Sequence, residues 1–306
     1  MGAVRSVRIH VPCSTSNLGP GYDSIGLALG LSNEFDFERI PSGVEIVLRG
    51  TGIDSLESGE QNRTYRAFRA VHERAGEPPP GVRIVQQNRV PIARGLGGSA
   101  TAVLAGTTAG LLFAGADASP SVVLDHSIAI ETHPDNLTPS LVGGLTVSSV
   151  DDGHVTFVRV TPPSELTTVT LIPDRVLETG AARRVVPETF SRDDVVFNIR
   201  GAAMLMAALA VGDLDPLRLA MRDRLHQPYR VPLLPGMDDI FAAALRAGSP
   251  GVALSGAGSG IFAFAYPDAA EGIGEAMQRE ARKHGIDSYA LHLPIDHRGL
   301  QIVSVE

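Results

Sequence analysis

A glycine-rich segment at residues 91–101 limits the possible folds of this chain more than any other feature. Gly95, Gly97 and Gly98 lie between an alternating apolar segment and a long alanine- and leucine-rich stretch without proline. This pattern predicts a strand, a tight turn and a helix. Glycines let backbone N–H groups converge on an anion, and the helix N-terminus favours negative charge. The segment therefore predicts a phosphate-binding loop.

The loop is not a Walker P-loop, which needs a lysine immediately before its serine or threonine. Here Gly98 directly precedes Ser99, and Lys283 is the single lysine of the chain. A charge-rich run surrounds Lys283, which indicates the solvated face of a late helix ending at Gly285. A glycine turn that only permits tight packing is the alternative for residues 91–101.

The first half of the chain alternates strand and helix patterns. Period-two apolar residues predict strands near residues 7–11, 44–48 and 82–84, and a hairpin at 145–160 around Asp151, Asp152 and Gly153. A further strand is predicted at 167–172, at the start of the second half. Helices are predicted at 62–75 and 99–114.

The second half is richer in helix patterns. Helices are predicted at about 198–211, 214–223, 238–247 and 268–284, with strands near 252 and 261–265. The apolar run 201–211 is too short to span a bilayer, so we expect a buried helix and no membrane segment. The adjacent Pro162 and Pro163 suggest two α+β domains, 1–163 and 164–306.

Charge and cysteine content exclude some classes of function. The net charge of −8 argues against an electrostatic grip on nucleic acid. Cys13 is the single cysteine and no signal-peptide pattern follows the start, so we expect a cytoplasmic protein.

Two further loops flank the phosphate loop in sequence. Residues 11–23 (VPCSTSNLGPGYD) precede it, and residues 251–260 (GVALSGAGSG) follow it. In order and spacing the three segments resemble the signature motifs of the GHMP kinases. The resemblance implies a ribosomal S5 domain 2-like N-terminal domain, a ferredoxin-like C-terminal domain, and an ATP-dependent small-molecule kinase.

Four more segments are similar to the homoserine kinases within that superfamily: residues 131–136, 179–183, 191–198 and 223–230. This resemblance implies transfer of the ATP γ-phosphoryl group to the side-chain hydroxyl of L-homoserine, a step of threonine biosynthesis. It is compatible with a homodimer.

The resemblance also implies roles for individual residues at the acceptor. Asp23 and His133 would hold the substrate ammonium group, and Asn136 its reacting hydroxyl. Arg183 and Arg230 would hold its carboxylate. An amino-acid zwitterion needs this combination of a carboxylate and bidentate arginines.

The remaining implied residues surround the nucleotide and line the acceptor pocket. Asn17 and Thr179 would line the same pocket, and Asn62 would lie near the adenine. Ser99 and Glu131 would hold Mg²⁺, which prefers hard oxygen ligands and keeps several waters. The implied catalytic residues are thus Asn136, Ser99 and Glu131. The implied ATP-phosphate loop consists of Pro91, Ile92, Ala93, Arg94, Gly95, Leu96, Gly97, Gly98, Ser99, Ala100 and Thr101.

The sequence departs from the family pattern at three positions. Gly98 replaces a usual serine, Cys13 a common alanine, and Gly260 lies where the third motif often differs. No lysine lies near any motif, so we expect direct attack by the hydroxyl with the γ-phosphate taking the proton. Two alternatives stay open: a GHMP kinase for mevalonate or a sugar, and a non-catalytic protein that binds ATP or an amino acid.

Overall fold

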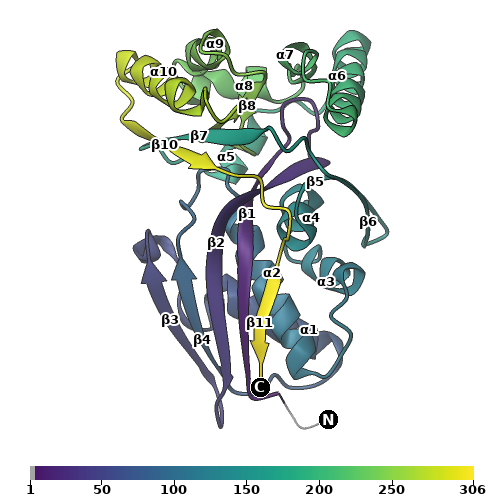
Figure 1. Ribbon diagram of the computed structural model, residues 1–306. Helices are drawn as coiled ribbons and strands as arrows, with labels where there is room; N and C mark the ends of the chain where they lie inside the picture. The colour runs from purple at the N-terminus through teal and green to yellow at the C-terminus, as the bar shows by residue number, and fades with distance from the viewer. Residues whose placement is uncertain (1–3) are drawn as a thin grey trace.

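Two β-sheets, each covered by helices, form the structure, a computed structural model that describes residues 4–306. Figure 1 shows the larger sheet below and the smaller sheet above it. The strands of the larger sheet are β1 (Ser6–Ser16), β2 (Ile25–Arg39), β3 (Val44–Gly50), β4 (Val82–Asn88), β5 (Leu145–Asp151), β6 (His154–Val160) and β11 (Gln301–Val305).

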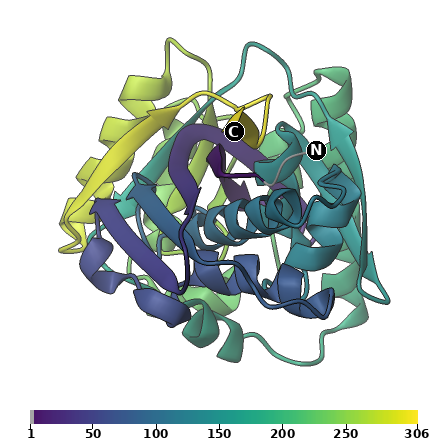
Figure 2. The same ribbon diagram turned by 90° about the horizontal axis from the view of Figure 1, so that it is seen from below.

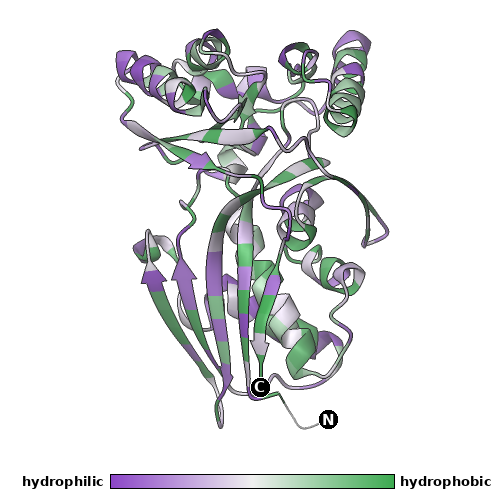
Figure 3. Cartoon of the chain, in the orientation of Figure 1, coloured by the Kyte–Doolittle hydropathy of each residue, from purple (hydrophilic) through white to green (hydrophobic). Residues whose placement is uncertain are grey.

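The larger sheet has the order β11-β1-β2-β4-β3, and the β5–β6 hairpin pairs with the N-terminal end of β2. Only β3 and β4 run parallel. In Figure 3 apolar and polar bands alternate along these strands, as expected for a sheet with one buried face. The predicted hairpin at 145–160 is confirmed, with positive φ at Asp152 and Gly153 in its turn.

Helices pack against this sheet and form the first apolar core. They are α1 (Arg63–Arg74), α2 (Gly98–Phe113), α3 (Pro120–Ser127) and α4 (Pro134–Val142). Figure 2 shows α2 in the middle of this layer. The predicted helices at 62–75 and 99–114 are confirmed as α1 and α2. Gly106 lies against the carbonyl of Thr64, where a Cβ atom would be 2.1 Å away, so the two helices cross in close contact.

The smaller sheet is antiparallel with the order β10-β7-β9-β8. Its strands are β7 (Thr167–Pro173), β8 (Val252–Leu254), β9 (Ile261–Ala265) and β10 (Ser288–Leu293). The helices of this half are α5 (Thr179–Arg184), α6 (Arg192–Val211), α7 (Leu217–Ala220), α8 (Gln227–Arg230), α9 (Met237–Arg246) and α10 (Ala270–Lys283). The chain passes from β7 through helices to the β8–β9 hairpin, and then through α10 to β10. This order is the ferredoxin-like arrangement.

Three strands were not predicted: β2, β11 and β10 of the smaller sheet. β2 is a long central strand whose first half is apolar on both faces, so that half lacks the period-two pattern. β11 leaves the second half of the chain and pairs with β1. The division into 1–163 and 164–306 remains a proposal, and the last strand of the second range belongs to the first sheet.

Two helix predictions were wrong. The helix predicted at 214–223 is the single turn α7, because Pro216 precedes it and Asp223 begins a hydrogen-bonded turn. The run 201–211 was expected to be buried, but it belongs to α6, most of whose residues are exposed or half-buried. Only Leu205, Ala208 and Leu209 of this run are buried in the core.

By its length and hydropathy, helix α6 could cross a membrane. No other helix in the described residues meets these two criteria. In Figure 1 it lies at the edge of the upper layer beside α7. Its first turn carries Asp193 and Asp194, and Ser191 caps its N-terminus through a hydrogen bond from the backbone N–H of Asp194. The buried residues of α6, such as Leu205, Ala208 and Leu209, pack on the protein core, as in a helix on the surface of a globular protein.

Candidate active site

The three motif loops meet between the two sheets. They are the motif segments of residues 11–23, 91–101 and 251–260. The Ser255 hydroxyl donates to the carbonyl of Gly95 at 2.7 Å, and the Gly256 N–H donates to the carbonyl of Ser16 at 3.1 Å. Ser255 Oγ is also hydrogen-bonded to Thr15 Oγ1 at 2.9 Å, so hydrogen bonds join the first and third loops across 240 residues of sequence.

A cavity of about 470 Å³ opens where these loops meet. The predicted residues that line it are Asn17, Asp23, Asn62, Pro91, Ile92, Ala93, Arg94, Gly95, Leu96, Gly97, Gly98, Ser99, Ala100, Glu131, His133, Asn136, Arg183 and Arg230. Thr101 does not line it, because its hydroxyl is buried between Asn33 Nδ2 (2.9 Å) and the carbonyl of Gly98 (2.8 Å). Thr179 begins α5, but its side chain lies outside the described part of the structure.

The phosphate loop ends at the N-terminus of α2, which begins at Gly98. Gly97 has φ +63, and a Cβ atom there would lie 2.6 Å from Ser14 Oγ and 2.8 Å from Asn136 Oδ1. Only glycine fits this position. At Gly98 a Cβ atom would meet nothing closer than Val90 Cγ1 at 3.7 Å. The unusual glycine at 98 is therefore not required by packing.

Ser99 and Glu131 face each other at the cavity wall. The Ser99 hydroxyl donates to Glu131 Oε2 in a short hydrogen bond, and Arg63 donates from Nη1 to both oxygens, at 2.5 Å to Ser99 Oγ and 2.9 Å to Glu131 Oε2. Ser99 Oγ and Glu131 Oε2 are hard oxygen ligands beside the N-terminus of α2, and Mg²⁺ prefers such ligands. Arg63 was not predicted from the sequence.

The acceptor end of the cavity contains a bidentate ion pair. Arg183 donates to the two carboxylate oxygens of Asp23 at 2.7 and 3.1 Å. His133, the N-cap residue of α4, lies with Nδ1 3.7 Å from Asp23 Oδ2. Burial lowers the pKa of His133, and the nearby Asp23 only partly opposes this. His133 therefore faces Asp23 as a neutral ring at neutral pH.

Asp23 is held in an uncommon backbone conformation. Its φ is +57, and that of Asn17 is +70, both in the left-handed region that non-glycine residues rarely adopt. Asn17 stabilises the turn by accepting from the Asp23 N–H at 3.0 Å and donating to the carbonyl of Gly256 at 3.0 Å. A backbone conformation of this kind, held in place by hydrogen bonds, is typical of residues in binding and active sites.

Arg230 is almost fully buried and has no carboxylate partner among the described residues. It donates to the carbonyls of Ala182 (3.2 Å) and Gly256 (3.1 Å) and to His226 Nδ1 (2.9 Å). Burial lowers the pKa of His226 to about 4, so its neutral ring accepts from Arg230 and donates from Nε2 to a backbone carbonyl. A buried guanidinium without a carboxylate partner is costly unless an anion binds it.

Tyr22 lies between the two arginines. Its ring centroid is 5.7 Å from the guanidinium carbons of Arg183 and Arg230, and the ring stacks on His226 at 4.9 Å. Cation–π contacts of this kind hold arginines in place without neutralising them. Neither Tyr22 nor His226 was predicted as part of the site.

Asn136 is positioned between the phosphate loop and the acceptor end. Ser14 Oγ donates to Asn136 Oδ1 at 3.0 Å, and Asn136 Nδ2 donates to Ser16 Oγ at 3.0 Å. Ser14 and Ser16 share one face of β1, a period-two signal in the first motif that could have identified them. Beside Asn136, burial raises the pKa of Asp135 to about 7, with Asp23 as a further cause.

Asn62 caps α1 at the nucleotide side of the cavity. Its Oδ1 accepts from the N–H groups of Thr64 (2.9 Å) and Tyr65 (3.3 Å), and its Nδ2 donates to the carbonyl of Glu57 (2.9 Å). These bonds are those of an ordinary N-cap residue. Its predicted place near the adenine is a proposal.

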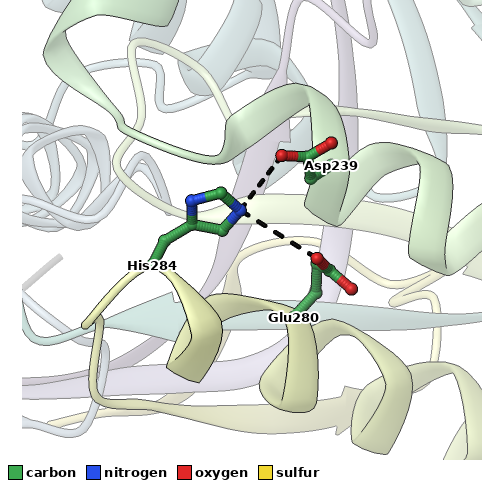
Figure 4. Close-up of side chains that lie close together, drawn as sticks. All are labelled: Asp239, Glu280 and His284. Atoms are coloured by element: carbon green, nitrogen blue, oxygen red, sulfur yellow. Dashed lines mark ion pairs between the residues drawn. The ribbon is translucent and has the colours of Figure 1, made fainter.

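A second cluster of ionisable side chains lies outside this cavity, on α9 and the end of α10 (Figure 4). His284 Nε2 is 3.0 Å from Asp239 Oδ2 and 4.0 Å from Glu280 Oε1, and Lys283 pairs with Glu280 at 2.9 Å. Ion pairs within α10 and from its end to α9, between exposed or half-buried side chains, explain this grouping without a metal. The prediction that Lys283 lies on a solvated helix face is confirmed.

Comparisons with known proteins identify relatives along the whole chain. The model of the GHMP kinases N terminal domain matches residues 62–144, and that of the GHMP kinases C terminal region matches residues 205–283. A homoserine kinase of Moorella thermoacetica is 39% identical over 96% of this chain and 99% of the relative. One of Trichormus variabilis is 39% identical over 98% of this chain and 99% of the relative. The crystal structure of homoserine kinase from Cytophaga hutchinsonii superposes with a TM-score of 0.88 at 27% identity, covering 97% of both chains.

Proposed function

Because this chain belongs to the homoserine kinases of the GHMP kinase superfamily, with their two-domain α+β fold, we propose that it phosphorylates the side-chain hydroxyl of L-homoserine with ATP. The observation that carries the proposal is the buried Arg230 in the same cavity as the Asp23–Arg183 pair, next to a glycine-rich helix N-terminus. A zwitterionic acceptor and a polyphosphate donor match these two ends.

The acceptor would bind by exchanging partners with the ion pair. Its carboxylate takes the place of Asp23 on Arg183 and adds the anion that Arg230 lacks, while its ammonium group takes the place of Arg183 on Asp23. Neutral His133 lies beside Asp23 and adds no competing positive charge. Asn17 and Thr179 complete the proposed pocket.

The donor would bind along the loop from Pro91 to Ala100, with Asn62 near the adenine. Backbone N–H groups of the loop and the N-terminus of α2 attract the phosphates. Members of the GHMP superfamily use ATP with Mg²⁺, and Ser99 and Glu131 are the residues that would hold the ion here. Bound there, Mg²⁺ supplies positive charge to the phosphates.

In the reaction, the hydroxyl oxygen of homoserine forms a bond to the γ-phosphorus as the bond to the β–γ bridging oxygen breaks, giving O-phospho-L-homoserine and ADP. The hydroxyl proton passes to the transferred phosphoryl group. Asn136, anchored by Ser14 and Ser16, would orient the hydroxyl. Catalysis then comes mainly from positioning and charge neutralisation.

A coupled assay of ADP release with homoserine, serine, threonine and mevalonate tests the proposal. We expect turnover with homoserine far above that with the other three. Preference for mevalonate would favour the alternative GHMP kinase. Nucleotide binding without any acceptor-dependent ADP release would favour a non-catalytic binding protein.

We further propose that the protein forms a homodimer in the cytoplasm. Val195 and Ile199 are exposed apolar side chains one turn apart on the same face of α6, and they support a symmetric contact. Ile199→Asp should lower the mass measured by light scattering to that of a monomer. An unchanged mass for this variant would remove α6 from the contact. The single Cys13, fully buried, fits a reducing compartment.

A further inference from the structure

Arg63 is the cationic residue in direct contact with both proposed Mg²⁺ ligands. It is the first residue of α1, and the N-cap bonds of Asn62 fix its backbone. Its side chain reaches Ser99 and Glu131, which are 36 and 68 residues away in sequence. Both of these contacts use the same nitrogen, Nη1.

The guanidinium has further donors available. Arginine carries five N–H groups, and within residues 4–306 only Nη1 of Arg63 makes side-chain hydrogen bonds. The side chain is 48% exposed and lines the cavity, so Nε and Nη2 are open to a ligand there. The Arg63 guanidinium can therefore bind an anion in the cavity while α1 keeps its place.

Three of the other four arginines that line the cavity are engaged elsewhere or face other parts of it. Arg94 lines the cavity, but its guanidinium donates to the carbonyls of Ile92, Ala93, Pro173 and Asp174. Arg183 and Arg230 belong to the acceptor end. Because no lysine lies near the loop, Arg63 supplies the side-chain charge nearest to Ser99 and Glu131.

Arg63 and a Mg²⁺ ion would compete for the same oxygens. Mg²⁺ requires close contacts of about 2.0–2.1 Å in octahedral geometry. Two cations on the Ser99 and Glu131 oxygens repel each other, so binding of the metal favours movement of the guanidinium. The phosphates of the proposed nucleotide would lie at the N-terminus of α2 and would offer the moved guanidinium a negative charge.

We propose that Arg63 is a catalytic residue of this kinase, which passes Ser99 and Glu131 to the metal and binds the γ-phosphoryl group through its planar fork. The inference rests on the proposed ATP and Mg²⁺ sites and adds to them a charge that stabilises the transferring phosphoryl. Arginines that act in this way in phosphoryl transfer raise kcat by about 10³- to 10⁵-fold. Bidentate contact with phosphate distinguishes arginine from lysine in this role.

Nucleotide binding without an acceptor tests the proposal apart from the identity of the acceptor. In Arg63→Gln, calorimetry with Mg²⁺ should show affinity for the non-hydrolysable analogue β,γ-imido-ATP reduced by ~10-fold or more, the effect of a lost charged hydrogen bond. Affinity for ADP, which lacks the γ-phosphate, should fall by less than 2-fold, a small effect expected for a group that contacts only the γ-phosphate. Equal losses for the two nucleotides would overturn the proposal.

Turnover and metal dependence provide two further measurements. Arg63→Gln should lose ~10³-fold in kcat, and Arg63→Lys should recover part of it because the charge is retained. The Mg²⁺ concentration needed for half-maximal binding of ADP should fall in Arg63→Gln, because a competing cation is gone. If neither this Mg²⁺ concentration nor kcat changes in Arg63→Gln, Arg63 has only a structural role in the wall of the cavity.

Arg66 provides the matched comparison. It lines the same cavity from the same helix, one turn further on, and within residues 4–306 it makes no side-chain hydrogen bond or ion pair with Ser99 or Glu131. Arg66→Gln removes the same charge, so a similar ratio of the two nucleotide affinities in both variants would assign the effect to the general potential of the cavity and refute the specific role. Thermal melting of each variant verifies that the fold is intact.

Discussion

Asp135 provides a quantitative test of how the acceptor end is built. Its side chain is 3% exposed, and burial raises its pKa from 3.8 to about 7. The folded chain therefore holds this proton more tightly than the unfolded chain. Between pH 4 and pH 7 the unfolded state loses the proton while the folded state keeps it, so the free energy of unfolding falls as the pH rises.

The magnitude follows from the shift. About three pKa units at about 1.4 kcal/mol each correspond to a destabilisation of about 4 kcal/mol above pH 7. Asp135→Asn cannot ionise and keeps a similar volume. The stability of the variant relative to the wild type should therefore increase by about 3 kcal/mol between pH 5 and pH 8.

Urea-induced unfolding followed by circular dichroism at pH 5, 6, 7 and 8 measures this difference. The exposed Asp151 in the β5–β6 hairpin gives the control, and Asp151→Asn should show no such change with pH. A difference between Asp135→Asn and wild type that stays constant from pH 5 to pH 8 would refute a buried, neutral Asp135.

Four substitutions test the donor and acceptor ends separately. Ser99→Ala and Glu131→Gln should each lower kcat by ~10²-fold or more through lost placement of the metal, and near-normal turnover in both would remove them from the metal site. Asp23→Asn should raise the KM for homoserine much more than that for ATP, and equal increases would place Asp23 outside the acceptor pocket. Gly98→Ser should fold normally, since a Cβ atom there meets only Val90 at 3.7 Å, and should lower the KM for ATP by roughly 2- to 10-fold. A higher KM for ATP in that variant would contradict a phosphate contact at position 98.

The sequence predicts the glycine-rich turn before α2 well because its signal is local. Gly97 is required by a positive φ and by close contact with Ser14 and Asn136, and such backbone constraints are visible in the glycines themselves. Helix α2 and the strands β7, β8 and β9 of the smaller sheet were predicted for the same reason, since apolar periodicity acts over short distances.

Side-chain contacts between distant segments could not be predicted in this way. The direction of Arg63 depends on the angle at which α1 crosses α2, and no periodicity in residues 62–75 marks it. The pairing of β11 with β1 joins residues about 300 positions apart. Composition also does not reveal which face of an apolar helix a protein core covers, and this is why α6 was expected to be buried.

The arginine clamp is the central claim of the account, and one measurement tests it directly. ADP release is measured for L-homoserine and for homoserine amide, with wild-type protein and with Arg183→Lys and Arg230→Lys. Lysine keeps the charge but loses the planar fork, so each variant should weaken homoserine binding by ~1.5–3 kcal/mol, that is about 10- to 150-fold, with ATP affinity nearly unchanged. The amide should be a poor substrate of the wild type and should be hardly affected by either substitution, as in a double-mutant cycle between ligand and protein. If the amide loses as much activity as homoserine does in these variants, the two arginines do not bind the substrate carboxylate.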